Sequence, residues 1–343
     1  PPQYNGFKLM LAKHTLAGED ISALYRLITQ KQLTCLDKRG QCFVYDITKD
    51  YIQAIVNDID LKRALKIVVD AGNGIAGRHI GRLYRALGCE VVELFCDVDG
   101  HFPNHHPDPA KPENLTDLIK AVQEHQAEVG LAFDGDGDRL IAVDEKGNII
   151  DGDQIMFIIG QEMHKNQELN NNMIVSTVMS NLGFYKALEN EGIQSNKTKV
   201  GDRYVVEEMR RGNYNLGGEQ SGHIVLMDYN TTGDGLLTGV QLAAIVKMSG
   251  KSLSELASQM KTYPQSLINV RVTDKYRVEE NIDVKEVMTK VEVEMNGEGR
   301  ILVRPSGTEP LVRVMVEAST DEDAKRYAQQ IADVVEDKMG LDK

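Results

Sequence analysis

Residues 134–139 read DGDGDR, a run in which three aspartates alternate with glycines between two apolar stretches. One apolar stretch ends at Phe133 and the next begins at Leu140, so the pattern predicts two strands joined by a turn. Carboxylates this close repel one another unless a cation neutralises them, and the glycines let the turn point all of them in one direction. The turn therefore predicts a site for Mg²⁺ or another hard divalent cation. The predicted metal ligands are Asp134, Asp136 and Asp138.

Two other interpretations of this turn stay open. An EF-hand loop also begins D-x-D-x-D, and Glu145 falls at its twelfth position, but Arg139 stands where that loop needs glycine and the flanks resemble strands. The second alternative is an acidic, solvated turn, although such turns rarely repeat Asp-Gly between two apolar stretches. We therefore favour the metal-binding loop.

Composition and charge limit the class of protein and its partners. A chain of 343 residues, 41% hydrophobic and 27% charged, predicts a globular protein of about two to four domains. The net charge of −13 argues against nucleic acid or an anionic membrane as the main partner, because both select clustered Lys and Arg. No apolar stretch approaches the roughly 18 residues that span a membrane, and no signal peptide is recognisable. We therefore expect a cytoplasmic protein.

The segment before the acidic turn predicts two parallel βαβ units. An apolar strand at 65–70 is followed by a glycine-rich turn, a helix to Leu87 and a second strand at 90–95. A loop at 99–114 and a helix at 115–125 then lead to the strand that ends at the acidic turn.

The glycine-rich turn carries a rival hypothesis. Gly72, Gly74 and Gly77 fit the G-x-G-x-x-G fingerprint of dinucleotide enzymes, and Glu90 or Glu93 stands near the position of a ribose-binding acid. The fingerprint is short, however, and a strand-to-helix turn needs glycines for close packing whether or not a phosphate binds there. We therefore favour a structural turn over a dinucleotide site.

The predicted fold class is α/β. The pattern indicates two consecutive mixed or parallel-sheet α/β domains with helices on both faces, at 49–149 and 150–258, followed by a C-terminal α+β domain at 259–343. Residues 1–48, with a short strand from Phe7 to Leu11 and a helix at 21–30, are too few to build a core of their own.

Two further loops carry polar side chains suited to a ligand. Residues 217–223 read GGEQSGH, a tight loop whose Glu, Ser and His suit sugar hydroxyls, although an ordinary Gly-rich turn is the alternative. Residues 304–310 read RPSGTEP between two predicted strands. Its backbone N–H groups, hydroxyls and Arg304 predict an anion cradle for a phosphate, with a loop of self-satisfied hydroxyls as the alternative.

The three loops together resemble one family. DGDGDR, GEQSGH and RPSGTEP occur in this order about 85 residues apart, and in this they are similar to the metal, sugar-recognition and phosphate-binding loops of the α-D-phosphohexomutase superfamily. The resemblance implies an enzyme, an intramolecular phosphotransferase with Mg²⁺ as cofactor. Such enzymes move phosphate reversibly between the 1- and 6-positions of a hexose phosphate through a phosphoserine and a bisphosphorylated intermediate.

The resemblance also assigns roles to residues. It implies catalytic roles for Lys8 and Arg139. Sugar recognition is implied for Lys199, Asp202, Arg203, Glu219, Ser221 and His223. The non-transferring phosphate is expected at Arg304, Ser306, Gly307, Thr308 and Arg313.

The start of the chain departs from the family pattern. Family members carry the phosphoserine in a loop S-H-N-P, and Pro1 matches the proline of that loop. The catalytic serine is thus expected three residues before Pro1, with 1–48 as the remnant of an N-terminal α/β domain. Residues 1–139 resemble bacterial phosphomannomutase/phosphoglucomutase and 140–343 resemble phosphoglucosamine mutase, so we expect a mosaic.

Expectations for the substrate follow from the second of these segments. We expect a hexose or hexosamine phosphate and its 1,6-bisphosphate, with glucosamine phosphate favoured because both the sugar loop and the phosphate cradle lie in it. Phosphomannomutase/phosphoglucomutase activity is the alternative, and a non-catalytic sugar-phosphate-binding fragment is an alternative of another class. We expect a monomer or homodimer.

Overall fold

A computed structural model describes residues 7, 9–12, 14–32, 40–59, 65–306 and 309–341. The chain divides into two units. Unit 1 comprises residues 1–179 and 193–258, and unit 2 comprises residues 180–192 and 259–343. The chain therefore passes from one unit to the other three times.

The first sheet of unit 1 has five strands in the order β4-β3-β5-β6-β7. Its first three strands along the chain, β3, β4 and β5, are parallel, whereas β6 pairs antiparallel with β5 and β7 antiparallel with β6. Both predicted βαβ units are thus present, and the acidic turn joins β5 to β6. The strands are β3 (Lys66–Asp70), β4 (Glu90–Leu94), β5 (Val129–Phe133), β6 (Leu140–Asp144) and β7 (Ile149–Ile150).

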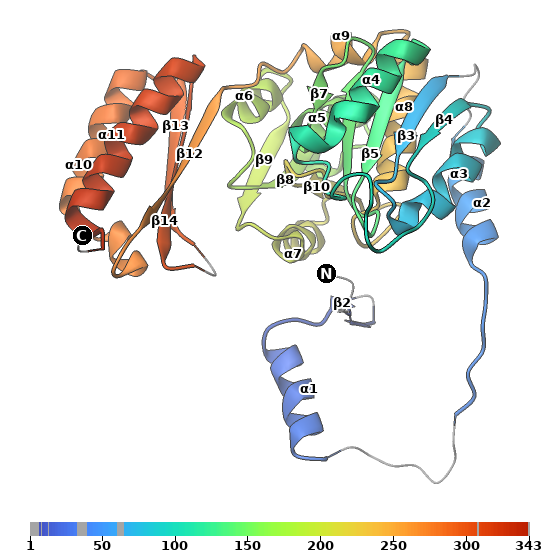
Figure 1. The fold of residues 1–343 in the computed structure, drawn as a ribbon, viewed down its shortest axis with the longest axis horizontal. Coiled ribbons are helices and arrows are strands. Elements are labelled where there is room, and N and C mark those ends of the chain that lie inside the picture. Colours follow the sequence, from blue (N-terminus) through green and yellow to red (C-terminus); the bar gives the residue numbers. More distant parts are fainter. Residues whose placement is uncertain are drawn as a thin grey trace. The chain divides into compact units, whose positions relative to one another are not determined.

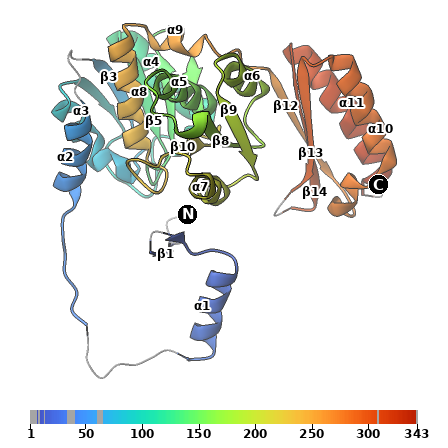
Figure 2. The ribbon, with the colours of Figure 1, turned by 180° about the vertical axis from the view of Figure 1, so that it is seen from behind.

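Helices cover both faces of this sheet. Val68, Ala132 and Ile141 pack against one helix, α4, whereas Leu131 and Leu140 lie against Gly239 of another, α8. Figure 1 shows α4 in front of the sheet and Figure 2, from behind, shows α8. The helices around the sheet are α2 (Thr48–Asp58), the 3₁₀ turn η1 (Ile75–Arg78), α3 (Ile80–Ala86), η2 (Pro112–Leu115), α4 (Thr116–His125) and α8 (Gly235–Ser249).

The second sheet of unit 1 has the order β11-β10-β8-β9. Two of its strands differ from the sequence expectation. β9 is built from the polar residues QSNKT, which show no apolar pattern, and Gly217 and Gly218, predicted in a loop, lie in β10. A Cβ at Gly217 would lie 2.9 Å from the Val175 carbonyl oxygen, so glycine permits close packing there. The strands are β8 (Met173–Thr177), β9 (Gln194–Thr198), β10 (Leu216–Gly218) and β11 (Ile224–Leu226).

Helices also pack on both faces of the second sheet. Ile174 and Leu216 lie against Gly160 of one helix, α5, and the alternate positions Val175 and Val225 pack with α7. The helices are α5 (Gly152–Lys165), η3 (Asn170–Asn172), α7 (Asp202–Gly212) and α9 (Leu253–Ala257).

The described residues before α2 form a short hairpin and one helix. β1 (Met10–Leu11) pairs with β2 (His14–Thr15), so the predicted strand is shorter than expected, and α1 (Glu19–Thr29) buries no residue. No helix within the described ranges is long and apolar enough to cross a membrane.

Unit 2 is built on an antiparallel sheet of order β12-β14-β13. The predicted α+β layer is confirmed: valines at alternate positions of β14 pack with two long helices, α10 and α11. The elements are α6 (Leu182–Asn190), β12 (Gln265–Arg271), η4 (Lys275–Glu279), α10 (Ile282–Met295), β13 (Gly299–Pro305), β14 (Leu311–Ala318) and α11 (Asp321–Met339).

Residues 180–192 pack on the opposite face of this sheet and are bound there by the carboxylate of Glu317. Glu317 is fully buried and accepts two hydrogen bonds from Arg300, at 2.9 and 3.1 Å. Its Oε2 also accepts from the backbone N–H of Leu182 at 2.8 Å. Because a buried carboxylate is costly without such partners, this network fixes α6 within unit 2.

The long loop of unit 1 between β4 and α4 is anchored by a second buried acid. Asp70, at the end of β3, is 1% exposed, and His105 Nε2 lies 3.1 Å from its Oδ2. Phe95 packs edge-on to the His105 ring. The hydrogen bond to Asp70 raises the pKa of His105, so the anchor is strongest while the imidazole is charged.

Replacing His105 tests this anchor. A pKa raised in the folded state means that the charged pair contributes its full stability below the unfolded pKa of about 6.5 and loses it as pH rises through the folded pKa. We expect His105→Gln to lower the unfolding free energy by about 1–3 kcal/mol at pH 5.5 and by less at pH 8.5. Urea unfolding at both pH values measures it, with exposed His106→Gln as control; an equal loss at both pH values contradicts the pair.

Candidate functional site

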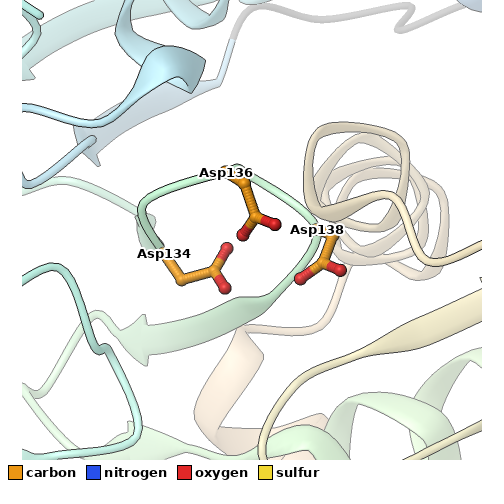
Figure 3. Close-up of side chains that lie close together, drawn as sticks. All are labelled: Asp134, Asp136 and Asp138. Carbon is orange, nitrogen blue, oxygen red and sulfur yellow. The ribbon is translucent and has the colours of Figure 1, made fainter. Parts of the chain in front are cut away.

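The acidic turn brings its three carboxylates together. Oxygen atoms of Asp134, Asp136 and Asp138 lie within 4.8 Å of one another, and Figure 3 shows the three side chains converging inside the loop. Their burial differs, since Asp134 is buried, Asp138 is half-buried and Asp136, between them on the loop, is exposed. A set of hard oxygen donors with open positions fits Mg²⁺, which prefers one or more carboxylates and retained waters.

The backbone of the turn fixes Asp134. Its Oδ1 accepts hydrogen bonds from the N–H groups of Gly137 and Arg139 at 3.0 and 3.1 Å, and Arg139 Nε lies 3.7 Å from Oδ2. Burial is the largest influence on this carboxyl and, together with the charges of Asp138 and Asp136, raises the pKa of Asp134 to about 7. The site thus favours either a proton or a cation near neutral pH.

Three glycines let other segments press against this turn. Cβ atoms at Gly74, Gly222 and Gly235 would lie 2.8, 2.2 and 2.6 Å from carbonyl oxygens of residues 135, 140 and 139, respectively. Each segment also makes a backbone hydrogen bond: Ile75 N–H to Gly135 O, Gly235 N–H to Gly137 O and Leu140 N–H to Gly222 O, all 3.0 Å long. The glycine-rich turn at 72–77 therefore serves as a packing surface, which supports the structural interpretation of its fingerprint over a dinucleotide site.

His223 joins the acidic turn to the sugar loop. It is 3% exposed, its Nε2 lies 3.5 Å from Asp138 Oδ2 and 3.9 Å from Asp202 Oδ2, and its backbone bridges to Arg139. Gly233 packs on its ring, because a Cβ there would lie 2.3 Å from Nε2. The structure therefore places His223 between two carboxylates, and the sugar contact that the resemblance implies for it stays a prediction.

The sugar loop is tied to the start of α7. Glu219 Oε1 accepts from Gly201 N–H at 2.8 Å, and Ser221 Oγ lies 3.3 Å from Oε2. Lys199 is exposed next to this contact, while Arg203 pairs with Glu207 at 2.6 Å on the surface of α7. Backbone contacts of the sugar loop therefore join it to the acidic turn on one side and to the start of α7 on the other.

Unit 2 carries a different site on the face of its sheet that holds Glu317. Arg304 and Arg313 stand directly opposite each other on β13 and β14. Like charges in this position repel each other, and the carboxylate of the exposed Glu309 lies 3.6 Å from Arg313. Burial and the charge of Arg313 both lower the pKa of Arg304, and Arg313 Nε is buried without a hydrogen-bond partner. The arrangement suits an anionic ligand such as phosphate.

A lysine that the sequence analysis missed completes this cationic group. Lys275 Nζ donates to the carbonyl oxygens of Ser306 and Glu309 at 2.5 and 3.0 Å, so it lies beside the predicted phosphate loop. Lys275 is 31 residues from Ser306 in the sequence, so no local sequence pattern predicts their contact. Ser306 itself is buried. Lys8, Gly307 and Thr308 lie outside the described residues.

The raised pKa of Asp134 predicts a pH-dependent cation effect. A folded-state pKa of about 7 against an unfolded value near 3.9 means that, without cation, ionising Asp134 lowers stability as pH rises toward 7. Below pH 7 a cation must displace the proton of the Asp134 carboxyl, whereas above pH 7 that carboxyl is already ionised. We expect MgCl₂ to raise the melting temperature more at pH 8 than at pH 6, and Asp134→Asn to abolish the difference. Equal shifts at both pH values in the unchanged chain contradict it.

The opposed arginines predict an unusual variant. Arg313→Gln removes one of two like charges, so we expect unchanged or slightly higher stability together with weaker binding of phosphate. Loss of a charge-assisted hydrogen bond of about 1.5–3 kcal/mol corresponds to a roughly 10- to 100-fold higher Kd. Calorimetric titration with inorganic phosphate measures it, and Arg326→Gln on the surface of α11 is the matched control. A phosphate Kd unaffected by Arg313→Gln refutes the anion site.

Comparisons with known proteins extend these observations. The family models for phosphoglucomutase/phosphomannomutase α/β/α domain II, α/β/α domain III and C-terminal domain match residues 49–147, 151–263 and 267–334. A phosphoglucosamine mutase of Staphylococcus aureus (strain bovine RF122 / ET3-1) is 72% identical over 300 residues, which cover 87% of this chain and 66% of that relative. The chain thus spans slightly less than two thirds of the length of this relative.

The match also bears on the predicted mosaic. An alignment of 300 residues within 343 necessarily crosses Arg139 and Leu140, where the seam was expected. A single relative therefore matches on both sides of that position, and the comparisons give the mosaic no support.

Solved structures agree with the family models. The crystal structure of a phosphoglucomutase/phosphomannomutase family protein from Burkholderia thailandensis is 32% identical with a TM-score of 0.83, covering 99% of this chain and 76% of that one. N-acetylphosphoglucosamine mutase of Aspergillus fumigatus, solved with GlcNAc-6P and magnesium, shares the fold at 18% identity and a TM-score of 0.66, covering 83% of this chain and 68% of that one. The chain belongs to the phosphoglucomutase/phosphomannomutase family, within the α-D-phosphohexomutase superfamily.

Proposed function

We propose that this protein takes part in the reversible transfer of phosphate between the 1- and 6-positions of a hexose phosphate, through a phosphoserine and a bisphosphorylated sugar. The observation that carries the proposal is the convergence of three carboxylates within 4.8 Å on a turn that the sugar loop contacts through its backbone. The 72% identity to a phosphoglucosamine mutase supports it.

The acidic turn is proposed as the Mg²⁺ site. Asp134, Asp136 and Asp138 would hold the ion, which supplies Lewis-acid stabilisation of the charge that develops during phosphoryl transfer. The magnesium complex of the Aspergillus fumigatus protein supports the choice of cation. Arg139 places a positive charge beside the acids, suited to transition-state stabilisation, and Lys8 is proposed to move a proton.

The remaining polar residues position the sugar phosphate. Glu219 and Ser221 are proposed to hold sugar hydroxyls, with Lys199, Asp202, Arg203 and His223 around them. The phosphate that is not transferred is proposed to bind in unit 2, at Arg304, Ser306, Gly307, Thr308 and Arg313. Positioning of this kind supplies much of the rate of phosphoryl transfer.

Glucosamine phosphate is the substrate that we favour, with its 1,6-bisphosphate as the intermediate. Its ammonium group suits a site that offers the carboxylates of Glu219, in the sugar loop, and Asp202, at the start of α7. Phosphomannomutase/phosphoglucomutase activity is the second candidate, because the Burkholderia thailandensis relative belongs to that group by name.

We further propose a cytoplasmic location, a monomer or homodimer, and functional domains at 1–48, 49–149, 150–258 and 259–343.

Calorimetry with three sugars tests the substrate. We expect glucosamine 6-phosphate to bind more tightly than glucose 6-phosphate and mannose 6-phosphate. We expect Glu219→Gln to reduce that preference by about tenfold, because a hydrogen bond to a charged group contributes about 1.5–3 kcal/mol and a neutral one about 0.5–1.5 kcal/mol. Glu162→Gln on α5 is the control on the same unit. Equal affinities for all three sugars in the unchanged chain exclude the glucosamine preference.

Turnover separates an enzyme from a binding fragment. Conversion of glucosamine 6-phosphate to the 1-phosphate is measured with the chain alone and with the added polypeptide segment that we predict to carry the serine. Turnover that requires the added segment supports the mutase. Tight binding with no turnover in either mixture favours the non-catalytic alternative.

A further inference from the structure

A tyrosine from α2 contacts the start of α8, far away in the sequence. The hydroxyl of Tyr51 lies 2.9 and 3.0 Å from the two carboxylate oxygens of Asp234, which is 183 residues further along the chain. Burial and the neighbouring carboxylate raise the pKa of the Tyr51 phenol, so the hydroxyl stays protonated and donates.

Asp234 is fixed by two further donors. It is the N-cap of α8, where its Oδ1 accepts from Leu237 N–H at 3.0 Å, and its Oδ2 accepts from Asn230 Nδ2 at 3.3 Å. The three donors are neutral, so they hold the carboxylate in place without cancelling its charge. Tyr51 contributes the one contact of these three that comes from another part of unit 1.

The residue after Asp234 contacts the acidic turn directly. Gly235 N–H donates to the carbonyl oxygen of Gly137 at 3.0 Å, and a Cβ on Gly235 would lie 2.6 Å from Arg139 O. The next residue, Leu236, also faces Gly137. A shift of the N-cap therefore moves the peptide that joins Asp136 to Asp138.

The same residues line one cavity. A hollow of about 250 Å³ is bordered by Tyr51, His79, Asp136, Asp138, Gly233 and Asp234, among others. Tyr51 and Asp234 thus line the same cavity as the carboxylates of Asp136 and Asp138. A change in the Tyr51–Asp234 contact therefore alters the space in which a cation and its waters would be held.

We infer that Tyr51 is a positioning residue for the cation site: by holding Asp234 it fixes the Gly235–Gly137 hydrogen bond and thereby the placement of Asp136 and Asp138. The inference rests on the proposed function only in requiring that the acidic turn binds a divalent cation. Residues that orient metal ligands from outside the ligand set commonly affect metal affinity by 10- to 100-fold.

The test is a Mn²⁺ titration of the whole chain followed by electron paramagnetic resonance. We expect Tyr51→Phe to raise the Kd for Mn²⁺ about tenfold and to change the line shape of the bound ion, which reports ligand geometry. Tyr263→Phe is the matched control, because that hydroxyl is also doubly hydrogen-bonded, to Glu298 at 2.6 Å and Lys186 at 2.9 Å, but belongs to unit 2. We expect its Mn²⁺ Kd to stay within about twofold of the unchanged chain.

A second variant shows whether Tyr51 acts through Asp234. Asp234→Ser keeps a good N-cap but withdraws the carboxylate from Tyr51. We expect it to weaken Mn²⁺ binding by itself and to make the further change to Phe at position 51 ineffective. If the Tyr51→Phe chain does not fold, the Kd of Asp234→Ser decides alone, and an unchanged Kd overturns the inference.

The outcomes separate this inference from the proposed function. No Mn²⁺ binding by the unchanged chain would overturn the proposed cation site and the inference together. Normal binding by the unchanged chain and an equal Kd in Tyr51→Phe overturn the inference alone. Equal weakening by Tyr51→Phe and Tyr263→Phe also overturns it, because the effect would then be general destabilisation.

Discussion

The mutual repulsion of Asp134, Asp136 and Asp138 is the constraint on which unit 1 depends. Three carboxylate groups within 4.8 Å would separate unless the backbone between them were held from outside. The structure holds it with hydrogen bonds from Ile75 and Gly235 and with one to Gly222, each at a point where glycine allows two backbones to meet. The βα turn after β3, the sugar loop and the start of α8 thus support this one loop against the repulsion of its carboxylates.

Unit 2 also holds like charges close together, but they are the positive charges of two arginines. On one face of its sheet, Arg300 pairs with Glu317 across β13 and β14, a complementary and buried pair that stabilises the unit. Four positions along β13, Arg304 faces Arg313 instead, and the like charges repel each other although Glu309 lies 3.6 Å from Arg313. Two cross-strand pairs of the same register thus differ in role: Arg300–Glu317 stabilises the fold, whereas Arg304–Arg313 suits the binding of an anionic ligand. The contrast supports the anion site proposed at Arg304 and Arg313 more directly than the loop sequence does.

The sequence was sufficient for the acidic turn, the parallel strands around it and the layered domains, because apolar periodicity and turn residues are local signals. It was insufficient for β9, whose polar side chains lie at a sheet edge, and for β10, where glycines serve close packing. Contacts between distant segments were also beyond it. The Arg304–Arg313 register, Lys275 beside Ser306 and Tyr51 on Asp234 all depend on how elements pack, which no spacing along the chain encodes.

The threefold passage of the chain between the units has a consequence for how such proteins can be divided or recombined. Residues 180–192 belong to unit 2 through Glu317 although they lie between two segments of unit 1. A protease cut or a genetic crossover at residue 258 would separate the C-terminal sheet from the helix that covers Glu317. The severed piece would expose a buried carboxylate and its arginine to water, so neither half would be a self-sufficient folding module. Evolutionary exchange of the C-terminal part is therefore expected to require matched sequences at both 180–192 and 259–343.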